Sequence, residues 1–255
     1  MALRETQGSH GDIVLSKVTG LEELFYDGTV RPRLFDLSES MRNTFEFERL
    51  GGKVIGGVLF SGPPGTGKTI AASALAKSAG WAMIITNGTD LARDPDKIKS
   101  VMTHAIEMKP CILFIDEADA LFSRRSKNWN LMATNAFLAQ TGDDRASLRD
   151  VMLIAATNNP QGADAAMLRE GRFGEHIKFS LPTRDTIQDF LEEETSKSPV
   201  GLSDAVLLAI SAFLEGTPLS NVRSALTRAG NQAAGRAMRQ GNGARPVITT
   251  KDFFI

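Results

Sequence analysis

Ten residues in the first third of the chain combine glycines with a lysine and a threonine in a spacing that suits phosphate binding. The stretch SGPPGTGKTI, Ser61–Ile70, contains the pattern G-x-x-x-x-G-K-T. Glycines in such a loop let successive backbone N–H groups turn inward around β- and γ-phosphates, Lys68 adds a positive charge, and the Thr69 hydroxyl can ligate Mg²⁺. The alternative is a chance turn, but the complete pattern between a predicted strand and a predicted helix favours a phosphate-binding loop. The residues expected to contact the nucleotide are Gly62, Pro63, Pro64, Gly65, Thr66, Gly67, Lys68, Thr69 and Ile70.

Two carboxylates follow an apolar stretch further along the chain, in CILFIDEADALF, Cys111–Phe122. The apolar residues predict a strand that delivers Asp116 and Glu117 to the carboxyl edge of a sheet, where ligands bind. Asp116 would hold Mg²⁺ through water, and Glu117 would orient and polarise the water that attacks the γ-phosphate. Such a pair in isolation is more commonly a charge pair at a helix N-terminus. Downstream of a complete phosphate loop, the catalytic interpretation is favoured.

Two arginines, Arg169 and Arg172, lie three residues apart in MLREGRFGEH, Met167–His176. Guanidinium groups suit the stabilisation of charge that develops on a phosphate. The alternative is that both arginines brace the loop by pairing with Glu170 or Glu175, although exposed ion pairs contribute little to stability.

Short apolar runs alternate with helical patterns through the first two thirds of the chain. The runs GVLFS, AMIIT, CILFID and VMLIAAT are apolar nearly throughout, which is typical of strands buried on both faces of a parallel sheet, and HIKFSL is a fifth candidate. Asp94 and Pro95 predict a helix start, and Pro110 predicts its end. The apolar face of this helix is predicted from Ile98, Val101, Met102, Ala105 and Ile106. The succession predicts an α/β fold with a parallel sheet flanked by helices.

The strand signals fade after Pro182, and helical patterns follow at Arg184–Ser196, Ser203–Glu215 and Leu219–Met238. This change predicts a small all-helical second domain. We therefore expect a large α/β nucleotide-binding domain at residues 1–181 and a helical lid at residues 182–255.

The composition excludes several classes of protein. With 255 residues and 42% hydrophobic content, the chain is long enough for a sizeable core. A net charge of −1 provides no overall attraction to nucleic acid or to anionic membranes. The single cysteine, Cys111, fits a reducing compartment, and no apolar run is long enough to predict a transmembrane segment in this chain. The expected location is the cytoplasm.

The motifs together resemble those of the AAA+ ATPases, and more closely their AAA clade. GPPGTGKT resembles the clade's Walker A motif, FIDEADALF its Walker B motif, and AATNNP its sensor 1 motif with Asn158 at the sensing position. MLREGRF is similar to the segment that carries two arginine fingers, at Arg169 and Arg172. The resemblance spans residues 16–255. It implies a P-loop domain with a helical lid, Mg²⁺-dependent ATP hydrolysis, a homo-oligomeric ring that is most commonly a hexamer, and coupling of turnover to the remodelling of a protein or another macromolecule.

Three positions depart from the pattern of the clade. The chain reads KVTG where the clade usually has an acidic residue, an aliphatic residue and two glycines, so adenine contacts would fall to Val18 and Gly20. Arg223 lies where other AAA+ groups place a sensor 2 arginine, and a solvated lid arginine is the alternative. The segment Gly88–Ile98 contains no aromatic residue, so a threading loop is not expected there.

A basic stretch near the C-terminus is not explained by the resemblance. Between Thr217 and Lys251 there is no Asp or Glu, whereas the cations are Arg223, Arg228, Arg236, Arg239, Arg245 and Lys251. An exposed face that meets the acidic surface of a neighbouring subunit is favoured over contact with nucleic acid or acidic lipid, because no aromatic residues interleave the charges. Two alternatives to the remodelling ATPase therefore stay open: a DNA-handling ATPase, and a switch whose nucleotide binding assembles a complex.

Overall fold

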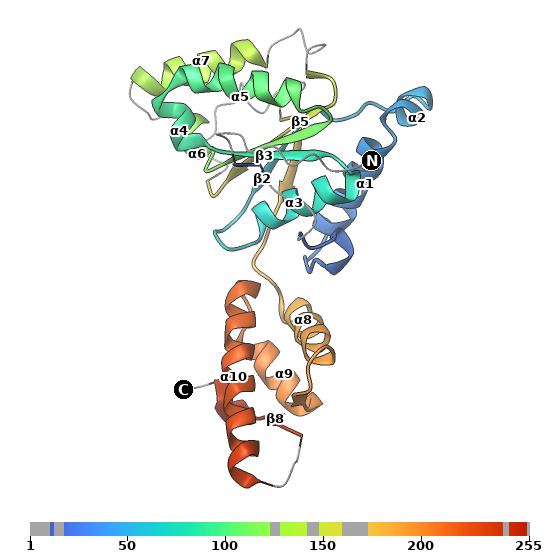
Figure 1. Cartoon of the computed structure of the whole chain (residues 1–255), viewed down its shortest axis with the longest axis vertical. Coiled ribbons are helices and arrows are strands. Elements are labelled where there is room, and N and C mark those ends of the chain that lie inside the picture. The colour runs from blue at the N-terminus through green and yellow to red at the C-terminus, as the bar shows by residue number, and fades with distance from the viewer. Residues whose placement is uncertain are drawn as a thin grey trace. The chain divides into compact units, whose positions relative to one another are not determined.

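The computed structural model describes residues 11–12, 18–122, 128–141, 148–159, 173–241 and 245–253. These residues form two compact units. The first holds the residues up to Leu24 together with Thr29–Phe179, and the second holds Phe25–Gly28 together with the chain from Ser180 onward. Figure 1 shows the first unit as helices around a sheet and the second as a group of helices.

A six-stranded sheet is the centre of the first unit, with the strand order β1-β3-β4-β5-β2-β6. All its neighbouring strands pair in parallel except β1, which is antiparallel to β3. The strands are β1 Gly11–Asp12, β2 Gly57–Ser61, β3 Ala82–Asn87, β4 Cys111–Asp116, β5 Val151–Thr157 and β6 Glu175–Lys178. Every residue of β2 and β5 is buried, which explains why these strands are apolar nearly throughout. The prediction of an α/β fold with a parallel sheet is confirmed.

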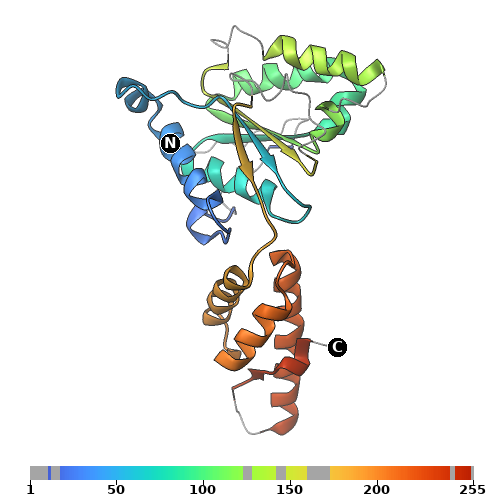
Figure 2. The same ribbon diagram turned by 180° about the vertical axis from the view of Figure 1, so that it is seen from behind.

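Helices cover both faces of this sheet (Figures 1 and 2). The helical segments of the first unit are η2 Leu21–Glu23, α1 Val30–Arg42, α2 Thr44–Arg49, α3 Lys68–Ala79, α4 Gly88–Arg93, α5 Pro95–Glu107, α6 Asp119–Phe122 and α7 Asn128–Gln140. Helices α1 and α3 lie together on one face, and α5 and α7 lie together on the other. The Asp94 side chain accepts a hydrogen bond from the Asp96 backbone N–H at 3.2 Å, so the predicted start of α5 is confirmed. Ile106, expected on the apolar face of α5, is instead 38% exposed.

The described residues of the second unit form three α-helices, a short pair of strands and a 3-10 helix. The helices are α8 Arg184–Ser196, α9 Asp204–Phe213 and α10 Leu219–Gln240, and they are accompanied by β7 Gly201–Leu202, β8 Val247–Ile248 and the 3-10 helix η5 Thr250–Phe253. Apolar residues of α8, α9 and α10, Ile187, Phe190, Leu191, Leu207, Ile210 and Val222 among them, form its core. The parallel pair β7–β8 was not predicted, because two residues are too few to show alternation.

The segment Phe25–Gly28 packs with the helical unit although it precedes α1 in the chain. The Asp27 carboxylate accepts hydrogen bonds from the Thr183 backbone N–H at 3.0 Å and from the Thr183 hydroxyl at 2.7 Å. The Phe25 ring meets the Phe190 ring edge to face, with centroids 5.5 Å apart. The domain boundaries at residues 1–181 and 182–255 stay a prediction.

Within the described ranges, none of the helices combines the length and the apolar composition needed to cross a bilayer.

Candidate active site

The loop after β2 is held between the ends of two neighbouring strands. The Gly62 backbone N–H donates to the Thr157 carbonyl at 3.2 Å, and the Phe179 N–H donates to the Ser61 carbonyl at 2.7 Å. Gly62 has a φ of +149°, and an added Cβ would lie 2.1 Å from the Phe179 carbonyl oxygen. Only glycine fits here, so the first glycine of the motif allows the loop to leave the sheet beside β6.

Lys68 opens α3, and its side chain turns back onto the loop that precedes it. Its Nζ donates to the carbonyls of Gly62 at 2.7 Å and Pro63 at 3.0 Å, and to Asn158 Oδ1 at 2.8 Å. Burial lowers the pKa of Lys68 from its ordinary value, while the carboxylates of Asp116 and Asp119 act in the opposite direction. A buried cation that has only neutral oxygen partners is a strong binding site for an anion placed at the same position.

Thr69 and Asp116 supply oxygen atoms next to the lysine. The Thr69 hydroxyl donates to Asp116 Oδ2 at 3.2 Å, so α3 and the carboxyl end of β4 meet at this point. A hydroxyl and a carboxylate are hard oxygen ligands that fit Mg²⁺, which keeps several waters and takes further oxygens from phosphates. Among the described residues no group of three or more His, Cys, Asp or Glu side chains could hold a metal on its own. The pair therefore suits a metal ion that arrives with a nucleotide.

Glu117 adopts a backbone conformation that residues other than glycine seldom take, with a φ of +50°. Its backbone N–H donates to Asp116 Oδ1 at 2.9 Å, and its Oε2 accepts from Asn87 Nδ2 at 3.0 Å. Asn87 ends the neighbouring strand β3, and its Oδ1 accepts from the Thr89 N–H at 2.7 Å as the N-cap of α4. An added Cβ on Gly88 would lie 2.6 Å from the Glu117 carbonyl oxygen. The position of Glu117 thus depends on the end of β3 as well as on β4.

Asp119 connects the segment after β4 to the end of β5. Its carboxylate accepts hydrogen bonds from the Thr157 hydroxyl and, at 3.2 Å, from the Asn158 backbone N–H. The Asn159 N–H donates to Thr157 Oγ1 at 2.9 Å. These bonds fix the backbone from which the Asn158 side chain reaches Lys68.

The structure therefore brings five predicted residues to one edge of the sheet: Lys68, Thr69, Asp116, Glu117 and Asn158. Two further residues of the site, Asn87 and Asp119, were missed by the sequence analysis. Asn87 is the polar residue directly after the strand run AMIIT, and Asp119 lies three residues after Asp116, so the sequence shows one polar residue at a strand end and one shortly after a strand.

The remaining predicted contacts of the phosphate loop are partly exposed. Pro63, Pro64 and Gly65 are exposed at the tip of the loop, whereas Thr66 is buried and donates to the Pro63 carbonyl at 2.8 Å. Ile70, on the first turn of α3, is 53% exposed. Gly67 precedes α3 as its N-cap residue.

The residues expected to meet the adenine lie against the same helix. The Val18 carbonyl accepts a hydrogen bond from Lys77 Nζ at 2.5 Å, and Lys77 is in the last turn of α3. The Gly20 backbone N–H donates to Glu23 Oε1 at 3.2 Å, and Gly20 is the N-cap of η2. The two predicted arginine fingers, Arg169 and Arg172, lie outside the described residues.

Arg223 belongs to the helical unit, where Glu194 and Phe190 are its partners. Its guanidinium lies 3.2 Å from Glu194 Oε1 and 5.2 Å from the centroid of the Phe190 ring. Both partners belong to the helical unit, and a sensor 2 role for Arg223 stays a prediction.

The basic stretch of the helical unit is partly neutralised within the unit. Arg236 forms an ion pair with the buried carboxylate of Asp252, which lies one residue beyond the stretch. Arg245 Nε donates to the Pro199 carbonyl at 2.6 Å. Arg223 also has a carboxylate partner, Glu194. Three of the six cations therefore have partners among the described residues of the unit, two of them carboxylates and one a carbonyl. The stretch is therefore less available as a continuous basic face than the sequence indicates.

Comparison with known proteins gives a family and a set of relatives. Residues 58–181 match the family model described as "ATPase family associated with various cellular activities (AAA)". An ATP-dependent zinc metalloprotease FtsH of Thermobaculum terrenum is 30% identical over 256 residues, which cover 95% of this chain and 37% of that protein. A proteasome-activating nucleotidase of Methanococcus vannielii is 33% identical over 245 residues, which cover 90% of this chain and 58% of that protein. An FtsH of Rhodothermus marinus is 31% identical over 265 residues, with coverages of 98% and 35%. The chain thus spans less than two thirds of the length of these relatives.

Proposed function

Since this chain belongs to the AAA+ ATPase superfamily, we propose that the site at the carboxyl edge of its sheet hydrolyses ATP to ADP and phosphate, and that turnover drives the remodelling of a protein or another macromolecule. The proposal rests on one arrangement above all. Lys68 of the phosphate loop contacts Asn158, while Thr69 contacts Asp116 directly before Glu117. A phosphate-binding cation, a pair of metal-binding oxygens and a candidate base are therefore neighbours.

Each side chain has a distinct role in the proposed reaction. Lys68 exchanges the carbonyls of Gly62 and Pro63 for phosphate oxygens of ATP, and the backbone N–H groups of the loop bind the same phosphates. Glu117 accepts a proton from a water molecule while the oxygen of that water attacks the γ-phosphorus. The bond from the γ-phosphorus to the bridging oxygen then breaks, and ADP leaves with the electron pair of that bond. Mg²⁺ held near Thr69 and Asp116 would offset negative charge on the phosphate oxygens.

Asn158 and Asn87 orient the reacting groups. Asn158 contacts Lys68 and would contact the γ-phosphate when ATP is bound, so it reports the presence of that group. Asn87 holds the Glu117 carboxylate by one hydrogen bond from β3. Val18 and Gly20 are proposed to contact the adenine, and Arg223 is proposed as a sensor 2 residue.

Arg169 and Arg172 are proposed to act on the ATP of a neighbouring subunit. This proposal is supported by the resemblance of MLREGRF to the arginine-finger segment of the AAA clade. A guanidinium at the γ-phosphate offsets charge in the transition state and contributes on the order of 10³-fold or more to the rate. Hydrolysis would then require a homo-oligomer, which we propose is a hexameric ring. Pairing of the arginines with Glu170 or Glu175 remains the alternative.

A protein is the proposed substrate of the remodelling. The names of two relatives connect nucleotide use with protein degradation: one is an ATP-dependent zinc metalloprotease, and the other is a proteasome-activating nucleotidase. A DNA-handling ATPase is less favoured because Arg236 and Arg245 of the basic stretch have partners within the helical unit. A switch that binds but does not hydrolyse ATP is less favoured because Glu117 is present. The single cysteine, Cys111, supports the proposal of a reducing, cytoplasmic location.

The proposal of a protein substrate is tested by measuring phosphate release with different additions. We expect the rate to rise when an unfolded protein such as reduced, alkylated lactalbumin is added, and to stay constant when double-stranded DNA is added at the same mass concentration. Stimulation by DNA alone would favour the DNA-handling alternative. ATP binding without phosphate release under every condition would favour the switch.

A further inference from the structure

A cavity lies in the α/β unit at the opposite edge of the sheet from the phosphate loop. It has a volume of about 250 Å³. Gly56 and Val151 line it at the amino ends of β2 and β5, whereas the phosphate loop follows the carboxyl end of β2. The cavity is small compared with typical ligand pockets, and its volume suits a single long side chain. None of the proposed catalytic or ATP-binding residues lines it.

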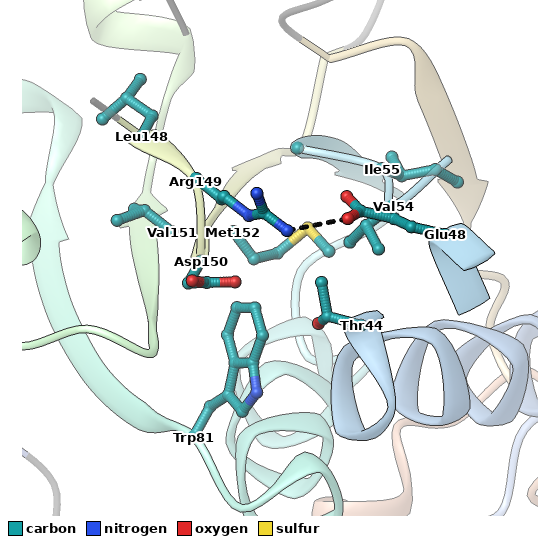
Figure 3. Close-up of a pocket in the computed structure, with 11 residues that line it drawn as sticks. Thr44, Glu48, Val54, Ile55, Trp81, Leu148, Arg149, Asp150, Val151 and Met152 are labelled. Atoms are coloured by element: carbon teal, nitrogen blue, oxygen red, sulfur yellow. Dashed lines mark hydrogen bonds and ion pairs between the residues drawn. The ribbon is translucent and has the colours of Figure 1, made fainter. Parts of the chain in front are cut away.

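The cavity combines an apolar base with charged walls (Figure 3). The Trp81 ring lies below the Asp150 carboxylate, and the side chains of Val54 and Met152 contribute further apolar surface. Arg149 extends across the cavity and forms an ion pair with Glu48 at 2.8 Å. Two carboxylates, on Glu48 and Asp150, and one guanidinium, on Arg149, leave one net negative charge in the lining.

Asp150 has no partner among the described contacts that would neutralise its carboxylate. Its backbone has a φ of +62°, a left-handed conformation that Asp tolerates better than most residues. Its backbone carbonyl accepts from the Cys111 N–H at 3.0 Å, which fixes the turn before β5. The strained turn thus presents a carboxylate to the cavity beside an aromatic ring, and strain of this kind is common at binding sites.

Helix α2 forms one wall of the cavity and also carries an exposed apolar surface. Thr44 and Glu48, one turn apart, line the cavity. Phe45 on the same helix is 76% exposed, and Leu50, the residue that follows the end of the helix, is 74% exposed. None of the residues of α2 is buried. Large apolar side chains that remain exposed beside a pocket are typical of protein interaction sites.

We propose that this cavity and the outer side of α2 form a docking site for a partner protein segment in which an arginine lies between apolar residues. The aliphatic part of the arginine packs on the Trp81 ring and Met152, and its guanidinium pairs with the Asp150 carboxylate, which balances the charge of the lining. The flanking apolar residues contact Phe45 and Leu50. This surface is separate from the ATP site and would let the ATPase select the protein on which it acts.

The test uses a pair of peptides that differ in charge but hardly in shape. One peptide has a central arginine between two leucines on each side, and the other has citrulline in place of the arginine. In the Trp129→Phe protein, Trp81 is the only tryptophan, so its fluorescence reports on the cavity directly. We expect the arginine peptide to change this fluorescence and to bind about five- to tenfold more tightly than the citrulline peptide, with the difference decreasing in high salt. Equal affinities, or no fluorescence change at millimolar peptide, would overturn the proposal.

Two variants connect the binding to the named residues. Asp150→Asn keeps a residue that tolerates a positive φ but removes the charge, so it should reduce the affinity for the arginine peptide to that for the citrulline peptide. Phe45→Ser should weaken both peptides equally, and Met238→Ser, a change of a side chain that is 83% exposed on α10, should weaken neither. ATP turnover without peptide should be unchanged in Asp150→Asn. If Trp81 fluorescence instead changes with protein concentration in the absence of peptide, and Asp150→Asn abolishes both that change and an oligomer, the occupant is a second copy of the chain and the proposal is wrong.

Discussion

At the scale of single residues, the site is a set of polar side chains that form hydrogen bonds with one another and with the backbone of the phosphate loop. Lys68 is bonded to two carbonyls and to Asn158, while Glu117 is bonded to Asn87. Each of these hydrogen bonds joins one charged side chain to a neutral partner. A charged phosphate oxygen is a stronger partner for Lys68 than a carbonyl, so ATP can replace the carbonyls while the lysine keeps its position. Such preorganisation reduces the reorganisation that is required during the reaction.

Asn87 positions Glu117 by a hydrogen bond but takes no part in the proposed proton transfer, so a change of Asn87 tests the positioning alone. Asn87→Asp keeps an acceptor for the Thr89 N–H at the start of α4 but replaces the donor to Glu117 with a second carboxylate. We expect turnover at neutral pH to fall roughly ten- to a hundredfold, while ATP affinity and thermal stability change little.

Asn87→Ala is the companion variant for this measurement. It also removes the hydrogen bond to Glu117, but it introduces no charge, so turnover should fall less than in Asn87→Asp. Unchanged turnover in both variants would show that Asn87 only caps α4.

The sequence alone was sufficient to propose the residues of a phosphate loop and a Walker B motif, since their spacing along the chain carries the proposed chemistry. Lys68 and Thr69 follow the glycines directly, and Asp116 and Glu117 follow a single strand. Asn87 and Asp119 could not be assigned in the same way, because their partners lie on other strands. The strand order that makes β3 and β5 the neighbours of β4 is a property of the folded sheet.

At the scale of elements, burial on both faces explains why the strands of the sheet were recognisable. All seven residues of β5 are buried, and so are all five of β2. The elements of the helical unit have weaker signals. Strands β7 and β8 have two residues each, and their pairing is supported by the Gly201 N–H, which donates to the Pro246 carbonyl at 2.8 Å.

The turn from β8 into η5 depends on the carboxylate of Asp252. This side chain is 3% exposed and accepts hydrogen bonds from Arg236, from the Thr249 N–H at 2.7 Å and from the Thr249 hydroxyl at 2.9 Å. Burial opposes ionisation, but the hydrogen bonds from Arg236 and Thr249 lower the pKa of Asp252 overall. A pKa that is lower in the folded state than in the unfolded chain stabilises the fold above the unfolded pKa, and this stabilisation is lost as the pH falls through the folded value.

Asp252→Asn should therefore destabilise the helical unit at neutral pH. We expect the melting temperature of this unit to fall by roughly 5 °C or more at pH 7. Below the unfolded pKa of about 4, the difference between variant and unaltered protein should decrease as the pH falls. Differential scanning calorimetry at several pH values measures both effects.

Glu193→Gln is the matched control for this prediction. Glu193 pairs with Lys197 at 2.6 Å on the surface of α8, where the two side chains are 37% and 57% exposed. An exposed pair contributes little, so the melting temperature should hardly change. A loss of stability equal to that of Asp252→Asn would show that burial of Asp252 is not the cause.

At the scale of the whole molecule, the two units have separate cores, and the chain passes from one unit to the other at three places. The assignment of Phe25–Gly28 to the helical unit could not be predicted from the sequence. It depends on the Asp27 contact with Thr183, which is 156 residues away along the chain. The sequence did predict the change from alternating strands to helices near Pro182, because the apolar runs end there.

Assembly provides the prediction at this scale, because Arg169 and Arg172 are proposed to act across a subunit border. Arg172→Ala should bind ATP but hydrolyse it on the order of 10³-fold more slowly. Lys68→Ala should not bind ATP but keeps both arginines. Mixing these two inactive proteins should restore part of the ATPase activity, because each supplies what the other lacks, and activity should rise with protein concentration. A mixture that assembles together yet stays inactive at every ratio would show that the arginines do not act in trans.

The central claim is that Glu117 activates the attacking water at a site where Lys68 binds the phosphates, and the most direct test separates ATP binding from phosphate release in Glu117→Gln. The amide keeps the shape of the side chain but cannot accept the proton, so we expect ATP affinity in the presence of Mg²⁺ to be retained within about threefold and phosphate release to fall on the order of a hundredfold or more. Lys68→Ala, measured alongside, should lose ATP binding itself. Phosphate release by Glu117→Gln at a rate close to that of the unaltered protein would contradict the account.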